Sequence, residues 1–353
     1  MAQKVHIPNF LAIPECELTA IAEVRPVLGE KVRARYGIPR LYGDHTALLA
    51  DPGIDAVAVS GAQSVQGEIA REALLAGKDV FVEKPMAVSL AQADGILAAA
   101  RRTGKRAMVA YMKRYDAGAE LAKSRIDAFR QSGDLGRTLY VRSHDFTGEW
   151  MAGLDTPLEE TDEPKLASPP AGPDWMPAEF IGKYVGYLQE CTHNVNLMRW
   201  FLDAGDDVTV RAVDLDDDGY TGIVVFDMAG TRAVLESGEI AYHRWDDHTQ
   251  VYFERGWVKV TSPPLLHKQV PAEVEVYQYG AGQGFSQPVP AAAYSWSYAR
   301  EAEHFISCLL SGEPFRSPAE DTRTDVRLFE EIYRQYLTQR GVLPAAQPVA
   351  ARD

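Results

Sequence analysis

The segment Val82-Glu83-Lys84-Pro85 contains residue types that could do chemistry. It ends a short apolar run that we predict to be a parallel strand, and doubly wound sheets bind ligands beyond the carboxyl ends of such strands. Lys84 could donate to a substrate hydroxyl there and hold down the pKa of a neighbouring acid or base. Pro85 has a fixed φ and could set the turn that aims Lys84. The segment also fits an exposed strand end, which on spacing alone is the commoner case.

A second polar group, Gln189 to Asn196, opens an otherwise apolar predicted helix and contains His193. Polar side chains in the first turn of a helix can face a cleft, and histidine is the side chain best suited to exchange protons near pH 7. His193 is therefore a candidate general acid or base. The alternative is a hydrogen-bonded core histidine, which is the commoner state of a lone histidine on a partly apolar helix.

Two further positions could bind a ligand. Glu23 ends an early predicted strand, where an acid in a dinucleotide-binding fold accepts from ribose hydroxyls and repels a 2′-phosphate. This favours NAD over NADP, although the nearby Arg25 weakens the preference, and a solvated Glu23 is the alternative. The run YMKRY at 111–115 could bind a carboxylate, a phosphate or a hydroxyl-rich ligand. An exposed basic turn would explain that run nearly as well.

The elements that must position these residues alternate in type over the first 110 residues. We predict strands at 18–24, 56–60, 80–82 and 107–111, and helices at 26–36, 42–49, 66–76 and 89–103. Apolar strands that alternate with helices of this kind imply parallel βαβ units. The predicted fold class is therefore α/β, with a doubly wound, Rossmann-type sheet.

After about residue 115 the pattern changes to an α+β arrangement. We predict helices at 117–131, 187–202, 297–311 and 322–339, a strand at 138–146, a long surface loop at 151–180, and further strands at 208–215, 221–228, 232–240, 250–253, 257–261 and 274–279. Turn residues between the later strands predict an open, mainly antiparallel sheet. The domains expected are 1–115 for dinucleotide binding and 116–340 for substrate binding and oligomer contacts, followed by a tail at 341–353.

Composition excludes several classes of protein. A formal charge of −14 argues against nucleic-acid binding, which needs clustered Lys and Arg. No apolar run approaches the roughly 20 residues of a membrane helix, and we see no secretory signal. Three scattered cysteines indicate reduced thiols and a cytoplasmic protein. His193, His243 and His248 lack the spacing of a shared metal site, so no metal is predicted.

Taken together, these motifs resemble the glucose–fructose oxidoreductase, inositol dehydrogenase and rhizopine catabolism family (Gfo/Idh/MocA). The most specific part is 55–85, DAVAVSGAQSVQGEIAREALLAGKDVFVEKP, with its DAV strand, AGK helix end and EKP motif. YMKRY at 111–115, GDLG at 133–136, H-x-x-N at 193–196 and SGEPFRSPAED at 311–321 extend the resemblance over nearly the whole chain.

The resemblance implies NAD or NADP as hydride carrier, with NAD slightly favoured. It implies that Lys84 contacts substrate and nicotinamide, that His193 is the general acid/base, and that Glu23 binds the ribose. We expect the following cofactor-binding residues: Glu23, Arg25, Ser60, Glu83, Lys84 and Pro85. We expect the following substrate-binding residues: Arg114, Tyr115, Gln189, Glu190 and His193.

The sequence departs from the family pattern in three places. Gln189 stands where members commonly have Asp, so we expect either a lower proton affinity of the histidine or substitution by Glu190 as its anionic partner. Gln66 replaces a frequent histidine near the nicotinamide. Residues 1–8 look like the helix after the glycine fingerprint, without the first strand and the G-x-G-x-x-G turn. We expect either a start roughly a dozen residues earlier, which we favour, or weak dinucleotide binding.

The resulting hypothesis is an oxidoreductase that transfers a hydride between nicotinamide and a sugar, cyclic polyol or related small molecule. Five aromatic residues would suit stacking on a sugar ring, although core or subunit contacts are the commoner role: Trp150, Trp175, Tyr184, Tyr187 and Trp245. We expect a homodimer or homotetramer formed through the second sheet. The alternative function is a non-catalytic relative that acts as a binding or regulatory protein.

Overall fold

A computed structural model describes residues 1–154, 156–165, 167–168, 170–241, 245–280 and 296–344, together with the backbone of 283–289. His243 and most of the predicted tail lie outside these residues. Among the described residues no helix is both long and apolar enough to cross a bilayer. The same residues contain no group of three or more His, Cys, Asp or Glu that could hold a metal ion.

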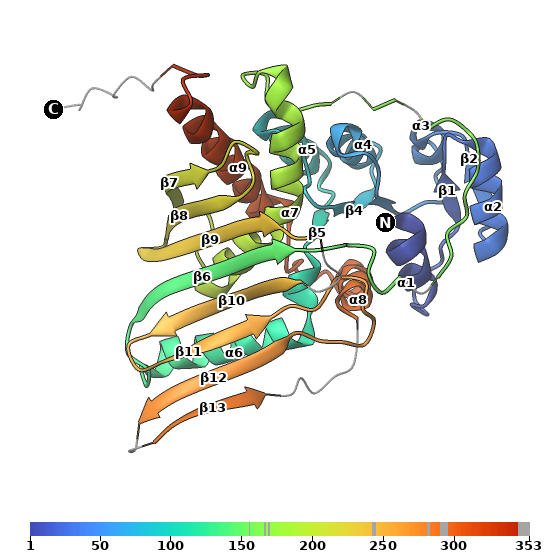
Figure 1. Ribbon diagram of the computed structural model, residues 1–353. Helices are drawn as coiled ribbons and strands as arrows, with labels where there is room; N and C mark the ends of the chain where they lie inside the picture. The colour runs from blue at the N-terminus through green and yellow to red at the C-terminus, as the bar shows by residue number, and fades with distance from the viewer. Residues whose placement is uncertain are drawn as a thin grey trace.

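The N-terminal part consists of short parallel strands flanked by helices (Figure 1). The strands are β1 (Ala20–Ala22), β2 (Arg40–Tyr42), β3 (Ala56–Val59), β4 (Asp79–Glu83) and β5 (Ala107–Ala110). The helices are η1 (Ala2–His6), α1 (Ile7–Leu11), α2 (Pro26–Tyr36), α3 (His45–Leu49), α4 (Gln63–Leu75), α5 (Leu90–Thr103) and the short η2 (Met112–Tyr115). The strands form two separate parallel ladders, β1–β2 and β3–β4–β5.

Local sequence accounts for the ends of these helices. The side chain of Ser89 caps α5 by accepting from the Gln92 amide, and Gly104 ends the helix at φ 70°, a conformation that favours glycine. Pro26 begins α2 at a position where its missing N–H costs nothing. The predicted alternation of strands and helices is confirmed, but β2 was not predicted, and the helix expected at 42–49 begins only at His45 because Tyr42 belongs to that strand.

The C-terminal part contains a mixed sheet of eight strands in the order β13-β12-β11-β10-β6-β9-β8-β7. Its strands are β6 (Thr138–Thr147), β7 (Val208–Leu215), β8 (Gly222–Met228), β9 (Thr231–Glu239), β10 (Asp246–Phe253), β11 (Gly256–Thr261), β12 (Glu273–Gly280) and β13 (Gln283–Val289). All neighbours are antiparallel except β6 and β9, which pair in parallel because β6 lies between two later strands. The sheet is thus mainly antiparallel, as predicted, with one parallel step.

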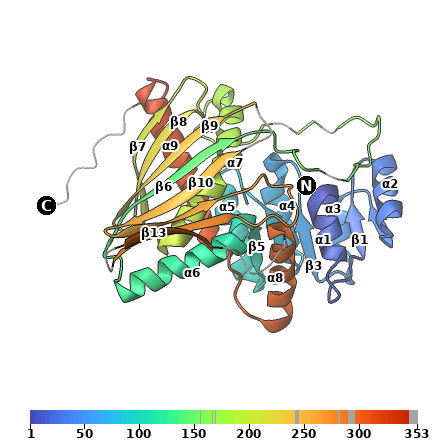
Figure 2. The same ribbon diagram turned by 60° about the horizontal axis from the view of Figure 1, so that its bottom comes forward.

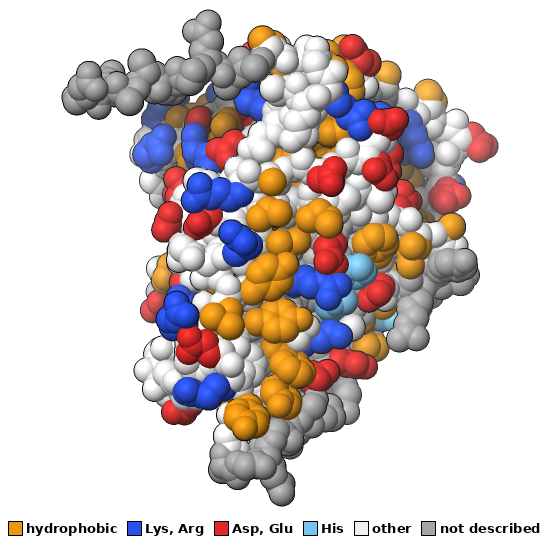
Figure 3. All heavy atoms as spheres, turned by 60° about the vertical axis from the view of Figure 1, so that its left-hand side comes forward, with side chains coloured by type: hydrophobic (Ala, Val, Ile, Leu, Met, Phe, Trp, Pro, Cys, Tyr) orange, Lys and Arg blue, Asp and Glu red, His pale blue; other side chains and the backbone are white. Residues whose placement is uncertain are grey.

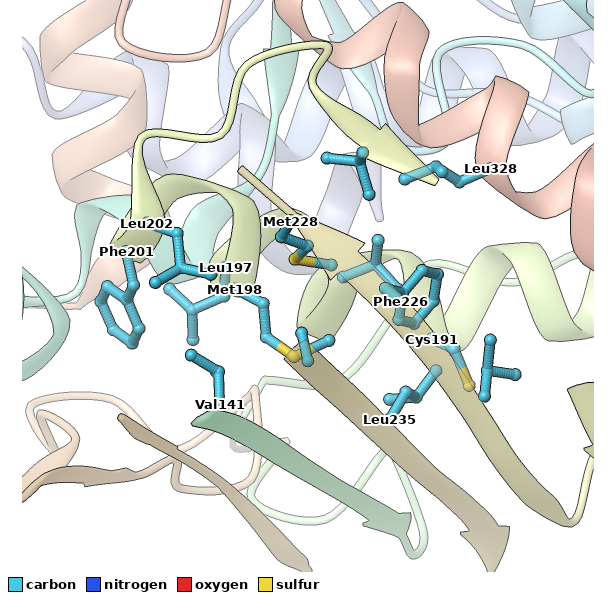
Figure 4. Packing of buried hydrophobic residues seen from close by; sticks show 14 of the residues in the cluster. Val141, Cys191, Leu197, Met198, Phe201, Leu202, Phe226, Met228, Leu235 and Leu328 are labelled. Atoms are coloured by element: carbon cyan, nitrogen blue, oxygen red, sulfur yellow. The ribbon is translucent and has the colours of Figure 1, made fainter. Parts of the chain in front are cut away.

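Helices cover one face of this sheet and leave the other open (Figures 1 and 2). They are α6 (Ala117–Ser132), α7 (Ala178–Leu202) and α9 (Ala319–Gln339). Alternate residues of β6, from Val141 to Thr147, point into the layer between strands and helices and are buried. Met198 and Phe201 of α7 belong to the same buried apolar cluster as Phe226 and Leu235 of the sheet, and this cluster is the main core (Figure 4).

One C-terminal helix, α8 (Ser297–Ser311), packs against the N-terminal part of the chain. The ring of Phe305 lies 5.5 Å from Phe81 of β4 and 6.3 Å from Phe10 of α1, in edge-to-face arrangements. The interval 116–340, predicted to form the second domain, therefore supplies a helix to the packing of the parallel sheet. The two parts of the chain are joined by a shared apolar core as well as by their linker.

Candidate active site

Lys84 connects the parallel sheet with the second part of the chain. It follows β4 directly, and the Lys84–Pro85 peptide bond is cis. Its Nζ donates a hydrogen bond of 2.7 Å to the backbone carbonyl of Gln189 in α7. That carbonyl lies one helical turn before His193, so the structure brings together the two segments that carry the predicted catalytic residues.

Buried hydrogen bonds hold the turn at the end of β4. The Glu83 carboxylate accepts from the Lys84 amide at 3.1 Å and contacts His6 Nε2 at 2.6 Å. Gln66 donates from Nε2 to the carbonyl oxygens of Glu83 and Pro85, at 2.5 and 2.9 Å. Gln66 therefore supports the backbone of the turn, and Glu83, predicted to bind cofactor, is bound to the protein through its side chain.

His193 is a buried histidine whose two ring nitrogens have no hydrogen-bond partner. Its ring lies edge-on to Tyr111 at 6.1 Å, and the Tyr111 hydroxyl is held by Thr192 Oγ1 at 2.8 Å. Burial, followed by the positive charges of Lys84 and Lys113, holds the pKa of His193 well below its ordinary value. The imidazole is therefore neutral at neutral pH, and both nitrogens are free to bond a ligand.

Lys113 belongs to a buried polar network beside the histidine. Its Nζ donates to Asn194 Oδ1 at 2.5 Å and pairs with Asp247 on β10. Asn194 Nδ2 in turn donates to Asp247 Oδ1 at 3.1 Å. The cation at 113, predicted as a possible ligand contact, is thus already neutralised by a carboxylate of the sheet.

Asp145 is a member of this site that the sequence analysis missed. It lies on β6 directly opposite Asp247, is almost fully buried, and leaves its Oδ2 without a hydrogen-bond partner. Burial first, and the charge of Asp247 second, raise the pKa of Asp145 to about 7. The sequence signal that could have revealed Asp145 is an acidic residue at an inward-facing position of a strand in which buried and less buried residues alternate.

Glu190 and Gln189 have exposed side chains. The Glu190 carboxylate accepts a hydrogen bond from the Tyr220 hydroxyl, and Gln189 contributes its backbone carbonyl to Lys84. Neither side chain bonds His193, whose two ring nitrogens have no hydrogen-bond partner among the described residues. The expectation that Glu190 substitutes as the anionic partner of the histidine therefore differs from the structure.

Arg114 and Tyr115 also differ from their predicted role in binding substrate. Both are buried, and Arg114 donates to Asn196 Oδ1 at 2.6 Å and to Asp321 Oδ2 at 2.8 Å. The Tyr115 hydroxyl pairs with Ser317 Oγ at 2.8 Å. Asn196 belongs to α7, Asp321 to the first turn of α9 and Ser317 to the residues just before α9, so the two side chains connect η2 to these elements.

The aromatic residues proposed for sugar stacking are mostly structural. Tyr184 and Tyr187 are completely buried in the main core, and Trp175 lies under the guanidinium of Arg334. Trp150 is half exposed, with the ammonium of Lys4 located 3.7 Å from its ring centroid. Core packing, the commoner alternative, therefore explains the two tyrosines.

Just beyond the carboxyl end of β1, Glu23 and Arg25 bind one another. The Arg25 guanidinium donates from Nε and Nη2 to the two oxygens of Glu23, at 2.8 and 3.1 Å, and the Arg25 amide adds a third bond. Ser60 directly follows the carboxyl end of β3. The predicted cofactor-binding positions thus lie at the carboxyl ends of β1, β3 and β4, where ligands bind in such sheets.

The residues present fit a nicotinamide nucleotide. His193 and Asp145 leave buried polar atoms without protein partners, and native proteins seldom leave such atoms unpaired. A nicotinamide ribose and a substrate hydroxyl would supply the missing hydrogen bonds. Lys84 would contact both from the end of β4, and Glu23 could accept from the adenosine ribose.

This fold and site define a dinucleotide-binding α/β protein with a lysine and a histidine contributed by its two parts. Residues 1–111 match the Gfo/Idh/MocA family, which is described as an oxidoreductase family with an NAD-binding Rossmann fold. The match covers the N-terminal third of the chain, and this third is similar to members of that family. The predicted resemblance to this family, the fold class and the dinucleotide cofactor are thereby confirmed.

Three similar proteins illustrate the relationship. The scyllo-inositol 2-dehydrogenase (NAD(+)) of Bacillus subtilis is 29% identical over 201 residues, which make up 56% of this chain and 50% of that enzyme. The myo-inositol 2-dehydrogenase of Thermotoga maritima is 23% identical over 333 residues, covering 90% of this chain and 88% of the relative. A 3-ketoreductase from Actinomadura kijaniata, crystallised with NADP and TDP-benzene, superposes with a TM-score of 0.70 at 20% identity, covering 95% of this chain and 94% of its own. The match thus spans half the length of the first relative.

Proposed function

We propose that this protein transfers a hydride between NAD(P) and a hydroxyl or carbonyl carbon of a sugar, cyclic polyol or related small molecule. The observation that carries the proposal is the Lys84–Gln189 hydrogen bond, which places the strand-end lysine beside the helical turn of a neutral, unpartnered His193. Relatives named as inositol dehydrogenases and a 3-ketoreductase support the substrate class. The comparisons give no support to the non-catalytic alternative.

In the direction of oxidation, the substrate hydroxyl loses its proton to an imidazole nitrogen of His193 while its carbon loses a hydride. The nicotinamide ring, when bound, supplies the carbon that accepts this hydride. Lys84 donates to the reacting oxygen and stabilises the negative charge that develops there as the proton leaves. In reduction the same steps run backwards, and protonated His193 returns the proton to the carbonyl oxygen.

Burial makes this pair of residues suited to the reaction. His193 is neutral because desolvation and two nearby lysines disfavour its cation, so it is ready to accept a proton at neutral pH. Burial also lowers the pKa of Lys84, which the neighbouring acids Glu83 and Glu190 partly oppose. We further propose that NAD is preferred, because Glu23 would face the ribose hydroxyls and repel an added phosphate.

The open face of the large sheet supports the proposal that the protein forms a homodimer or homotetramer. Outward-facing aromatic rings follow one another across four strands: Tyr140, Tyr252, Trp257 and Tyr277. Figure 3 shows this apolar band running along the face between charged side chains. A second copy of the chain would cover the band. A cytoplasmic location remains our proposal, in keeping with three free cysteines.

Titration of the purified protein with NADH and NADPH, followed by assays of inositols and aldoses with the oxidised cofactors, tests the proposed function. The expected result is saturable dinucleotide binding and reduction of the cofactor by at least one cyclic polyol or sugar. Failure to bind either dinucleotide at millimolar concentration would show that the enzyme interpretation is wrong. Dinucleotide binding without turnover of any member of the panel would favour the binding or regulatory alternative.

A further inference from the structure

A segment of the second part of the chain crosses the edge of the parallel strands. Residues 150–154, 156–165 and 167–168, which we call the strap, follow the end of β6 and run past α2 and α3 on the way to α7 (Figure 1). Gln3 exchanges two hydrogen bonds with the Glu159 backbone, at 2.8 and 3.1 Å. Lys31 and Arg35 of α2 donate to the carbonyls of Glu160 and Pro157, at 2.9 and 2.6 Å. The strap is therefore fixed to the N-terminal part by several bonds.

Glu163 of the strap occupies the N-terminus of α2. Its Oε1 accepts from the Val27 amide at 2.9 Å and its Oε2 accepts from the Leu28 amide at 2.8 Å. Pro26, the first residue of α2, has no N–H to offer. One carboxylate thus takes both of the free amides in the first turn, and the positive end of the helix dipole favours its negative charge.

The carboxylate of Glu163 lies close to the residues expected at the adenosine ribose. Arg25, which immediately precedes α2, is bound in a bidentate manner to Glu23, and the charge of Glu163 acts on the same guanidinium. The Arg25 guanidinium is therefore shared between two acids. A 2′-phosphate placed here would lack both a free arginine and the free helix amides that bind such groups.

We propose that Glu163 is a specificity-determining residue that excludes the 2′-phosphate of NADP from the head of α2 and so favours NAD. This inference rests on the proposed function, because it presumes that the adenosine ribose binds beside Glu23. Glu163, from the second part of the chain, would thus add to the discrimination between NAD and NADP that Glu23 would otherwise provide alone. Discrimination arises because the phosphate has to displace Glu163 or lie against its charge.

The test compares the dissociation constants of NADH and NADPH, measured by calorimetry on the full chain. Glu163→Gln retains the shape of the side chain and one acceptor but removes the charge. It should improve NADPH binding relative to NADH by about fivefold or more, the effect of one unit charge a few ångströms away under water-like screening. Glu160→Gln is the matched control, because it removes an equal charge from an exposed strap side chain whose backbone alone contacts α2.

A relative gain for NADPH in Glu163→Gln but not in Glu160→Gln supports the proposal. An unchanged ratio, an equal gain for both dinucleotides, or an equal effect of the control overturns it. An equal gain for both would identify the strap as a general competitor of the dinucleotide. If the unaltered protein binds neither dinucleotide, the proposed function itself fails, which is distinct from an unchanged ratio in a protein that binds both.

Discussion

Lys84 Nζ lies 2.7 Å from the carbonyl oxygen of Gln189, and this hydrogen bond links the end of β4 to the α7 turn that carries His193. The two segments are more than 100 residues apart in the sequence. The bond therefore depends on the packing of the second part of the chain against the parallel sheet. Changes of the Lys84 side chain should affect turnover more than they affect folding.

Replacement of Lys84 by alanine should reduce kcat by about 10²-fold or more, because the reacting oxygen loses a positioned cationic donor. The fold and the affinity for dinucleotide should be largely retained, since among the described residues the Lys84 ammonium donates to a single backbone carbonyl. Steady-state kinetics, together with circular dichroism and NADH titration, check this. Near-normal turnover would remove Lys84 from the mechanism.

The pH dependence of oxidation should reflect the lowered pKa of His193. A base must be unprotonated to accept the substrate proton, and burial with two nearby lysines keeps His193 unprotonated well below its ordinary pKa. The acid limb of kcat/KM for His193 should thus lie at lower pH than for an ordinary histidine. His193→Gln should lose activity at every pH. If the pH profile of this variant still shows an acid limb near pH 6.5, a group other than His193 is the base.

Asp145 should make stability depend on pH in a particular direction. Its pKa is about 7 in the folded protein and 3.8 in the reference state, so the folded form binds the extra proton between these values. Stability should therefore fall as pH rises from about 4 to 7, and Asp145→Asn should remove part of this fall. Urea midpoints measured across that range test it.

Asp247→Asn is the control for the Asp145 variant. It removes a carboxylate from the same strand pair but leaves Lys113 buried without its counterion. This variant should be less stable than the unaltered protein at neutral pH, whereas Asp145→Asn should be at least as stable. Equal destabilisation by both variants would show that Asp145 is ionised and paired in the folded state.

A charge on the open face of the large sheet should weaken self-association. Trp257→Glu places a carboxylate within the aromatic band, next to Tyr277 at a ring distance of 4.2 Å. Light scattering after gel filtration should show a smaller assembly for this variant. Leu310→Glu, at an exposed position of α8, is the control and should leave the mass unchanged. A monomeric unaltered protein would contradict the proposed oligomer.

Much of the fold could be predicted from local patterns. The bounds of α2, α8 and β7 agree with the sequence-based expectations, and Pro26 and Gly312 mark the start of α2 and the end of α8. The start of α7 at Ala178, nine residues before the predicted start at 187, was missed because two glycines interrupt its first turns. The parallel pairing of β6 with β9 could not be predicted, since strand order depends on contacts between distant segments.

The site was predictable only where a motif marks it. Lys84 and His193 belong to recognisable motifs, and the structure places them at the same junction. Asp145 and Glu163 belong to no motif, and their importance arises from partners on other elements, namely Asp247 and the head of α2. Arg114 does belong to a motif, but its structural role could not be predicted, because Asp321, which accepts its hydrogen bond, lies some 200 residues later.

A double-mutant cycle between Lys84 and His193 tests the central claim most directly. The rate of cofactor reduction would be measured for the unaltered protein, Lys84→Met, His193→Gln and the double variant, with the best substrate of the inositol and sugar panel. If the two side chains act on the same reacting hydroxyl, the loss in the double variant will be much smaller than the product of the two single losses. Losses that multiply would contradict the account, because they would show that Lys84 and His193 act independently.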